Sequence, residues 1–108
     1  MTDKLMFALG LCRKAGKLAV GADATAEAAE KKRAYAILLS SDAAQRTQQA
    51  AEEAAAKCGA PLHRVNRTIA EMEKGTGRAF AVAAVTGRDQ ARLIELTLEQ
   101  ENGGTVCL

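Results

Sequence analysis

The chain has 108 residues, a length that suits one folded domain and leaves little room for a second core. Hydrophobic residues make up 48% and charged residues 26%, which excludes a disordered or fibrous protein. No apolar run approaches the roughly 20 residues that span a bilayer, and the N-terminus lacks a signal-like pattern. Composition therefore predicts a globular cytoplasmic protein without a membrane partner.

Positive charge is concentrated in two segments that the net charge of +2 conceals. Residues 1–35 hold seven Lys and Arg against four Asp and Glu, and residues 61–88 hold five against two. Residues 89–108 hold one against four, so this acidic stretch offsets the others. The distribution of charge is thus a better guide to binding partners than its sum.

The first predicted helix follows Thr2 or Asp3, either of which can cap it. Its apolar face recurs at helical spacing and consists of Leu5, Ala8, Leu9, Cys12 and Ala15. Gly16 is placed to end this helix, and residues 17–20 are long enough only for a short strand.

A second helix is predicted after Gly21, which turns the chain. Asp23 is the expected N-cap, and the helix should reach about Arg33. Residues 35–39 then form an apolar run that predicts a strand buried on both faces.

Asp42 is the expected cap of a third helix, which Gly59 closes. The apolar stripe of this helix is Ala44, Thr47, Ala51, Ala54, Ala55 and Cys58. Residues 61–65 alternate between apolar and polar side chains, which predicts a less buried strand.

Thr68 and Glu71 have the spacing of a capping box and predict a short fourth helix that stops near Gly75. Residues 75–77 should form a loop, followed by an apolar strand over residues 79–85. The last helix should run from Arg88 to about Glu101, with Ala91, Ile94 and Leu98 on its apolar side.

Helices and strands alternate without an internal repeat, which predicts a single domain over residues 1–101. Helices on both faces of the sheet give a three-layer α/β/α sandwich. Residues 102–108 have no periodicity and are expected to form a flexible tail.

Catalytic and metal-binding motifs are not found in the sequence. The glycines of "EKGTGR", residues 73–78, follow a helix and precede a strand, the reverse of a phosphate-binding loop. His63 is the only histidine and has no neighbouring nucleophile or carboxylate pair. The three cysteines, Cys12, Cys58 and Cys107, are far apart without a C-x-x-C pair, so we expect reduced thiols, the first two of them in helix faces and Cys12 packed. We therefore expect no enzyme activity, cofactor or metal.

Two groups of basic residues flank the second predicted helix. Arg13, Lys14 and Lys17 precede it, and residues 31–33 lie at its far end. Either group taken alone is typical of an ordinary solvated surface, whereas cations that converge on one face predict binding to phosphates. Aromatic residues are only 3% of the chain, so stacking of unpaired bases is not expected to be the main binding mode.

The segments "AGKLAVGADA", "AILLSSDA", "CGAPLHRV" and "GRAFAVAAV", in this order, resemble a known family. They are similar to the bacterial YlxQ-type proteins of the ribosomal L-seven-Ae and L-thirty-e superfamily, over roughly residues 4–95. The resemblance implies an α/β/α sandwich around a mixed four-stranded sheet. It also implies a non-enzymatic RNA-binding protein of ribosomal-protein type, with kink-turn RNA as ligand and possible association with the ribosome.

Gly16, Lys17 and Gly21 match the pattern of the RNA binders in that superfamily, whereas three later positions depart from it. Asp23 replaces Asn, Ala24 replaces Glu, and Glu27 replaces Lys at positions that the resemblance assigns to sheared G·A pairs and nearby phosphates. We therefore expect recognition of structured RNA by shape and phosphate contacts. The alternative is a protein-interaction or regulatory module that kept the fold and lost RNA affinity.

The resemblance places the loop of residues 75–78 beside Gly21, on the same surface. Asp23 has two interpretations, a helix cap and an acceptor for a guanine edge, which are compatible. The predicted RNA-binding residues are Arg13, Lys14, Gly16, Lys17, Gly21, Asp23, Gly77 and Arg78.

Overall fold

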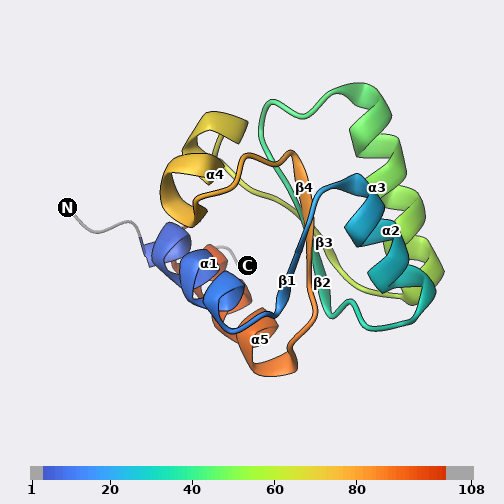
Figure 1. Cartoon of the computed structure of the whole chain (residues 1–108), viewed down its shortest axis with the longest axis horizontal. Coiled ribbons are helices and arrows are strands. Elements are labelled where there is room, and N and C mark those ends of the chain that lie inside the picture. The colour runs from blue at the N-terminus through green and yellow to red at the C-terminus, as the bar shows by residue number, and fades with distance from the viewer. Residues whose placement is uncertain (1–3, 102–108) are drawn as a thin grey trace.

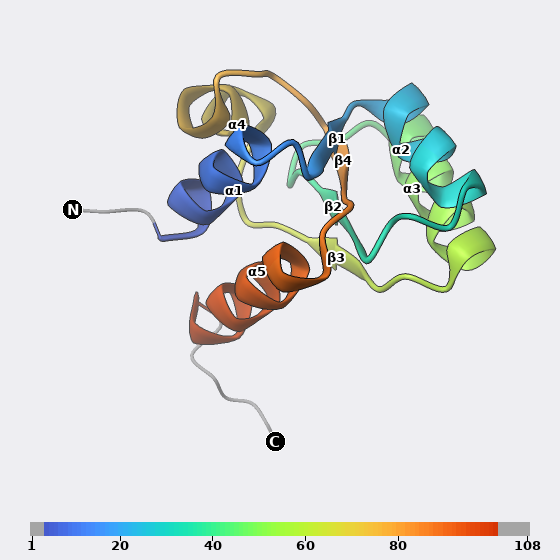
Figure 2. The ribbon, with the colours of Figure 1, turned by 60° about the horizontal axis from the view of Figure 1, so that its bottom comes forward.

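A computed structural model describes residues 4–101 and has three layers (Figure 1). A four-stranded sheet is covered on one face by α2 (Ala22–Glu30) and α3 (Gln45–Cys58). The other face carries α1 (Lys4–Lys14), α4 (Ile69–Thr76) and α5 (Arg88–Glu101), as the rotated view of Figure 2 also shows. The predicted α/β/α sandwich is confirmed.

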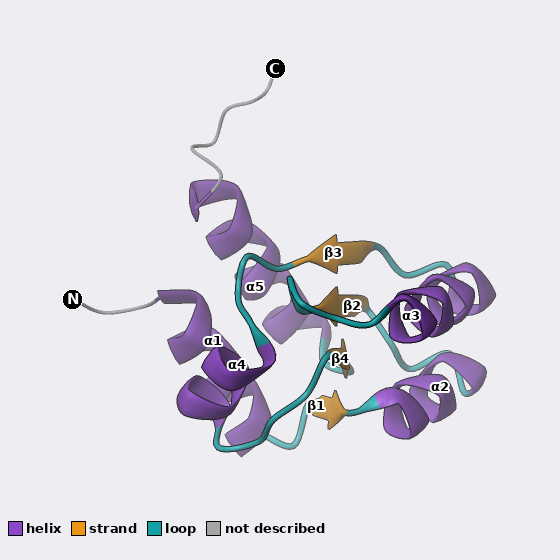
Figure 3. Ribbon diagram, turned by 90° about the horizontal axis from the view of Figure 1, so that it is seen from above, coloured by secondary structure: helices purple, strands orange, loops and turns teal. Residues whose placement is uncertain are grey.

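The sheet is mixed, with the strand order β1-β4-β2-β3. Its strands are β1 (Leu18–Val20), β2 (Ala36–Leu39), β3 (Leu62–Arg64) and β4 (Val82–Val85). β2 pairs parallel with β3, whereas β4 lies antiparallel between β1 and β2 (Figure 3). The edges of the sheet are therefore β1 and β3.

The two central strands are buried on both faces and divide the core into two clusters. Because successive strand residues point to opposite faces, Ala36, Leu38, Ala83 and Val85 pack toward α1, α4 and α5. Ile37, Leu39, Val82 and Ala84 pack on the opposite face, largely against alanines of α2 and α3. Small side chains at this second face let the two helices lie close to the sheet.

Several predicted boundaries were wrong because the signals used were incomplete. α2 ends at Glu30, not near Arg33, because Lys32 adopts a left-handed conformation with φ 57° and the chain leaves the helix there. No glycine marks this turn. β4 is shorter than the predicted residues 79–85, since it pairs with β2 only from Val82 to Val85.

Further corrections concern single residues at the ends of elements. Ala15 and Tyr35, expected on buried faces, are exposed, the first after α1 ends and the second before β2 begins. Gly75 and Thr76, expected in a loop, complete α4, which Gly77 terminates with φ 86°. The capping box of Thr68 and Glu71 is confirmed, with both reciprocal hydrogen bonds present.

Asp42 stabilises a different helix from the one expected. α3 begins at Gln45 with Ala44 as its N-cap. The Asp42 carboxylate instead accepts a hydrogen bond of 2.9 Å from the backbone N–H of Ile69, the first residue of α4. A negative charge is favourable there because it faces the positive end of the helix dipole.

Within residues 4–101, no helix is both long and apolar enough to cross a membrane. The predicted flexible tail, residues 102–108, lies outside the described residues.

Candidate nucleic-acid interface

Two connections distant in sequence meet at one end of the sheet. The turn between β1 and α2 contains Gly21, whose backbone N–H donates a 2.9 Å hydrogen bond to the carbonyl of Val82 at the start of β4. The loop of residues 77–81, which connects α4 to β4, therefore ends beside the N-terminus of α2 (Figure 1). We call this the Gly21 end of the sheet.

Gly21 has a backbone conformation that favours glycine. Its φ of 98° and ψ of 166° are rarely adopted by residues with a side chain. It is the N-cap of α2, and its carbonyl accepts the backbone N–H of Thr25 at 3.0 Å. The first turn of α2 thus starts directly from the edge strand, with no side chain over the turn.

Asp23 is not the N-cap of α2, contrary to the sequence prediction. It is the second residue of the helix, is exposed, and makes no capping hydrogen bond with its side chain. Gly21 is the N-cap instead, because it is the single residue between β1 and α2. The Asp23 carboxylate still lies in the first turn, where the helix dipole favours a negative charge.

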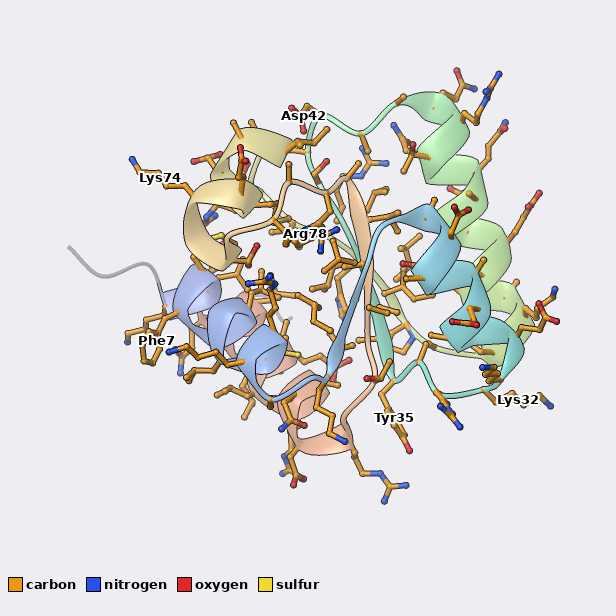
Figure 4. The ribbon with its side chains drawn as sticks, viewed as in Figure 1. Phe7, Lys32, Tyr35, Asp42, Lys74 and Arg78 are labelled. Carbon is orange, nitrogen blue, oxygen red and sulfur yellow. The ribbon has the colours of Figure 1, made fainter. Side chains whose placement is uncertain are left out.

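Arg78 follows Gly77 on the α4–β4 loop and is exposed. Its backbone N–H donates to the hydroxyl of Thr76 at 3.3 Å, which holds the loop against the end of α4. Figure 4 shows Arg78 between α4 and β1, whereas Lys74 points away from the outer side of α4. Among the described residues, the Arg78 guanidinium has no hydrogen bond or ion pair.

Arg13 reaches this loop from the last turn of α1. Its guanidinium donates a 3.0 Å hydrogen bond from Nη1 to the carbonyl of Thr76, across 63 positions of sequence. A Cβ atom at Gly77 would lie 3.3 Å from the same nitrogen. Arg13 thus donates to a carbonyl at the C-terminal end of α4, where helix carbonyls lack partners within the helix, and it places a second cation beside Gly77 and Arg78.

Gly16 and Lys17 lie at the other end of β1. Gly16, with φ 74°, ends α1, and the backbone N–H of Thr86 donates to the carbonyl of Lys17 at 2.8 Å. The Lys17 stem lies over Gly87, because a Cβ there would be 3.0 Å from Lys17 Cγ. We call this the Lys17 end of the sheet.

Lys14 is exposed in the last turn of α1. Its side chain lines a groove that lies between α1 and α4.

The α4–β4 loop links most of the predicted binding residues: Arg13 contacts its start beside Gly77 and Arg78, and its end lies beside Gly21. Asp23 is in the first turn of the helix that begins at Gly21. Gly16 and Lys17 lie at the opposite end of β1 from Gly21, next to the end of α1, where the Gly16 N–H donates to the carbonyl of Arg13 at 3.0 Å. The position of Arg13 against α4 carries no local sequence signal, because its partner is 63 residues away.

Cys12 is a packed thiol, as predicted. Its side chain is fully buried, and its thiol donates a 3.2 Å hydrogen bond from Sγ to the carbonyl oxygen of Lys17. Burial raises the pKa of this thiol to about 11, so it stays protonated at neutral pH.

The two positions that depart most from the family pattern lie along α2. Ala24 is partly buried, and Glu27 is exposed and forms an ion pair of 3.5 Å with Lys31 on the next turn. Glu27 therefore projects into solvent and its charge is only weakly compensated.

His63 has a structural environment. It lies in the edge strand β3, half-buried, with Nε2 3.1 Å from a carboxylate oxygen of Glu95 on α5. Among the described residues, no group of three or more His, Cys, Asp and Glu side chains is arranged to hold a metal ion.

Comparison with known proteins identifies the fold. No family model and no curated protein matches the chain. A solved structure of a protein of unknown function from Bacillus halodurans superposes with a TM-score of 0.82 at 20% identity, covering 91% of this chain and 99% of the other. The 15.5kD RNA binding protein of Giardia lamblia superposes with a TM-score of 0.69 at 10% identity, covering 97% and 93%. The chain therefore shares the fold of both proteins.

Proposed function

We propose that the protein binds structured RNA at the Gly21 end of the sheet, without enzymatic activity. One observation carries this proposal: an open glycine turn at the N-terminus of α2 lies beside the end of the loop that carries Arg78, and Arg13 from α1 contacts the start of the same loop. The fold shared with the Giardia RNA binding protein supports it. The resemblance to the L-seven-Ae and L-thirty-e superfamily suggests kink-turn-like RNA, and we assign the chain to its YlxQ-type members.

Each residue of the interface has a distinct role in this proposal. Gly21 lets the RNA backbone approach the N-terminus of α2, where backbone N–H groups face an anion. Arg13 and Arg78 contact phosphates, and the Asp23 carboxylate accepts a hydrogen bond from a guanine edge. Gly77 keeps the loop open between them. Lys14, Gly16 and Lys17 contact the RNA only where it extends along α1 and β1.

Ala24 and Glu27 favour shape and phosphate recognition over reading of base edges. Ala24 offers no hydrogen-bonding side chain, and the exposed Glu27 repels phosphate. Losing one contact to a base edge costs about 1 to 3 kcal/mol of discrimination. We therefore propose modest sequence specificity and a large electrostatic share of the affinity, in a cytoplasmic protein that acts with ribosomal or other structured RNA.

A gel-shift titration tests the proposal. We expect kink-turn RNA to bind more tightly than an unkinked duplex or a single strand, and all binding to weaken steeply with salt. Equal weak binding of the three RNAs would argue against recognition of shape. Absence of binding at low salt would favour the alternative, a protein-interaction module.

A double substitution tests the alignment with the superfamily. Ala24→Glu with Glu27→Lys restores the residue types of the RNA binders and should increase affinity for kink-turn RNA about tenfold. Glu52→Lys with Ala56→Glu, exposed on α3, is the matched control and should change little. No gain in the first variant would contradict the assignment of these two positions.

A further inference from the structure

A groove between α1 and α4 continues from the proposed RNA-binding face. Its volume is about 260 Å³, and it is lined by Met6, Phe7, Gly10, Leu11, Arg13, Lys14, Gly75 and Thr76. Arg13 belongs to both places, because it lines the groove and donates to the carbonyl of Thr76 beside Gly77. Arg13 therefore connects the groove with the loop of the proposed interface.

Two glycines set the depth of the groove. A Cβ at Gly75 would lie 2.7 Å from Met6 Cβ, and a Cβ at Gly10 would lie 3.3 Å from the carbonyl oxygen of Gly75. The two helices thus cross in close contact, and the side chains on either side of the crossing form the walls. The groove results from the packing of α1 against α4, so its shape is formed before a ligand binds.

The walls combine an exposed aromatic ring with positive charge. Phe7 is 62% exposed and Leu11, one turn later, is 45% exposed. Figure 4 shows Phe7 projecting from α1 away from the sheet. Of the described residues that line the groove, Arg13 and Lys14 are charged, and none is a carboxylate.

Phe7 has no evident role in folding. Phe80 is buried in the core, and the ring of Tyr35 lies 5.6 Å from the guanidinium carbon of Arg88. Phe7 instead exposes most of its surface in a groove whose lining also includes Arg13 and Lys14. An aromatic face beside cations is the combination that binds unpaired nucleotides, through stacking of the base and attraction of its phosphate.

We propose that the groove binds an unpaired nucleotide that flanks the structured RNA, with the base on Phe7 and Leu11 and the phosphate near Arg13 and Lys14. The inference rests on the proposed RNA-binding function. A basic peptide is a less suitable occupant, because the charged side chains among the described lining residues are the cations Arg13 and Lys14.

The experiment compares one structured RNA with two versions that carry a short unpaired extension at the 5′ or the 3′ end. We expect one extension to raise affinity about fivefold or more, the usual effect of stacking one base. Phe7→Ala should remove this gain and leave the affinity for the unextended RNA unchanged, whereas Phe7→Trp should keep it. Leu96→Ala, a similarly exposed apolar residue on α5, is the matched control and should preserve the gain.

The outcomes separate this inference from the proposed function. If the unextended RNA binds and neither extension adds affinity, the groove proposal is overturned and the function stands. An extension effect that survives Phe7→Ala also overturns it. If no RNA binds, both proposals fail together.

Discussion

The two ends of the β1–β4 pair differ in how their cations are used. At the Lys17 end, Arg88 stacks over the ring of Tyr35, and the Lys17 stem covers Gly87. Toward the Gly21 end, Arg13 donates one hydrogen bond from Nη1 to the carbonyl of Thr76 at the end of α4. The Arg78 guanidinium has no hydrogen bond or ion pair among residues 4–101. Figure 4 places Arg78 and Tyr35 at opposite ends of the sheet.

The surrounding backbone differs as well. At the Gly21 end α2 begins at an open glycine turn, and the loop that carries Arg78 ends beside it. At the Lys17 end a helix terminates in Gly16, where the last carbonyls carry partial negative charge. Cations alone do not distinguish the two ends. Both ends also carry the N-terminus of a helix, because α5 begins at Arg88 beside Gly87 at the Lys17 end. The difference is that the Arg88 guanidinium lies over the ring of Tyr35, whereas the Arg78 guanidinium has no hydrogen bond or ion pair among residues 4–101.

The largest expected difference concerns RNA affinity. Arg78→Ala should weaken binding about tenfold and lower the slope of affinity against salt by about one, because one phosphate contact is lost. Lys17→Ala, the matched exposed cation at the other end, should leave both nearly unchanged. Titrations of both variants at several salt concentrations decide this. Equal losses would show that RNA runs along the whole of β1 and would remove the distinction between the ends.

Backbone strain should also differ between the ends. Gly21→Ala should lower the free energy of unfolding by about 1 to 3 kcal/mol, because alanine rarely adopts φ 98° with ψ 166°. Gly16→Ala, at φ 74°, should cost about 1 kcal/mol, since the left-handed helical region is more accessible. A steric clash causes neither loss of stability, because no atom lies within 4 Å of a Cβ added at Gly16 or at Gly21. Chemical denaturation measures both values, and a larger loss at Gly16 would contradict this reasoning.

The buried thiol at the Lys17 end should make stability depend on pH. The pKa of Cys12 rises from 9.0 in the unfolded chain to about 11 in the folded one, so the folded state holds its proton longer. Stability is therefore complete below pH 9 and decreases as the pH rises toward 11, by about 1.4 kcal/mol at pH 10. Cys12→Ala should show a smaller decrease between pH 8 and 10 in urea denaturation. Identical slopes in both proteins would indicate that other groups cause the decrease.

The smallest expected effect concerns the N-terminus of α4, the helix that precedes the Arg78 loop. Asp42→Ala removes the acceptor for the Ile69 N–H and should cost about 1 kcal/mol of unfolding free energy. Asp89→Ala, also in the first turn of a helix but at the Lys17 end, has no such hydrogen bond in the structure and should cost less. Thermal unfolding of the two variants compares these positions. Equal losses would show that the Asp42 hydrogen bond adds nothing beyond its charge.

Much of the secondary structure is predictable because its signals are local. The capping box of Thr68 and Glu71 and the terminating Gly59 each lie within a few residues of the helix end that they define. Errors arose where a residue had two possible partners. Asp42 precedes α3 and is a reasonable cap for it, yet it accepts a hydrogen bond from Ile69 at the N-terminus of α4, 27 residues later in the sequence.

The candidate site was only partly predictable. The residues that resemble the family include Gly21, Gly77 and Arg78, which lie together, and also Gly16 and Lys17, which lie apart from them. Arg13 is near Lys17 in sequence but contacts Thr76 instead. The groove beside Phe7 could not be inferred at all, because it depends on how two helices cross.

The sequence by itself determined which segments become helices and strands, and which strands are buried on both faces. Hydrophobic spacing, capping residues and glycine positions act over a few residues and are legible in the chain alone. The tertiary structure decided that β4 lies between β1 and β2, that Arg13 meets the Arg78 loop and that Lys17 does not. These contacts join residues far apart in sequence, so they depend on the packing of the whole domain, which no local pattern encodes.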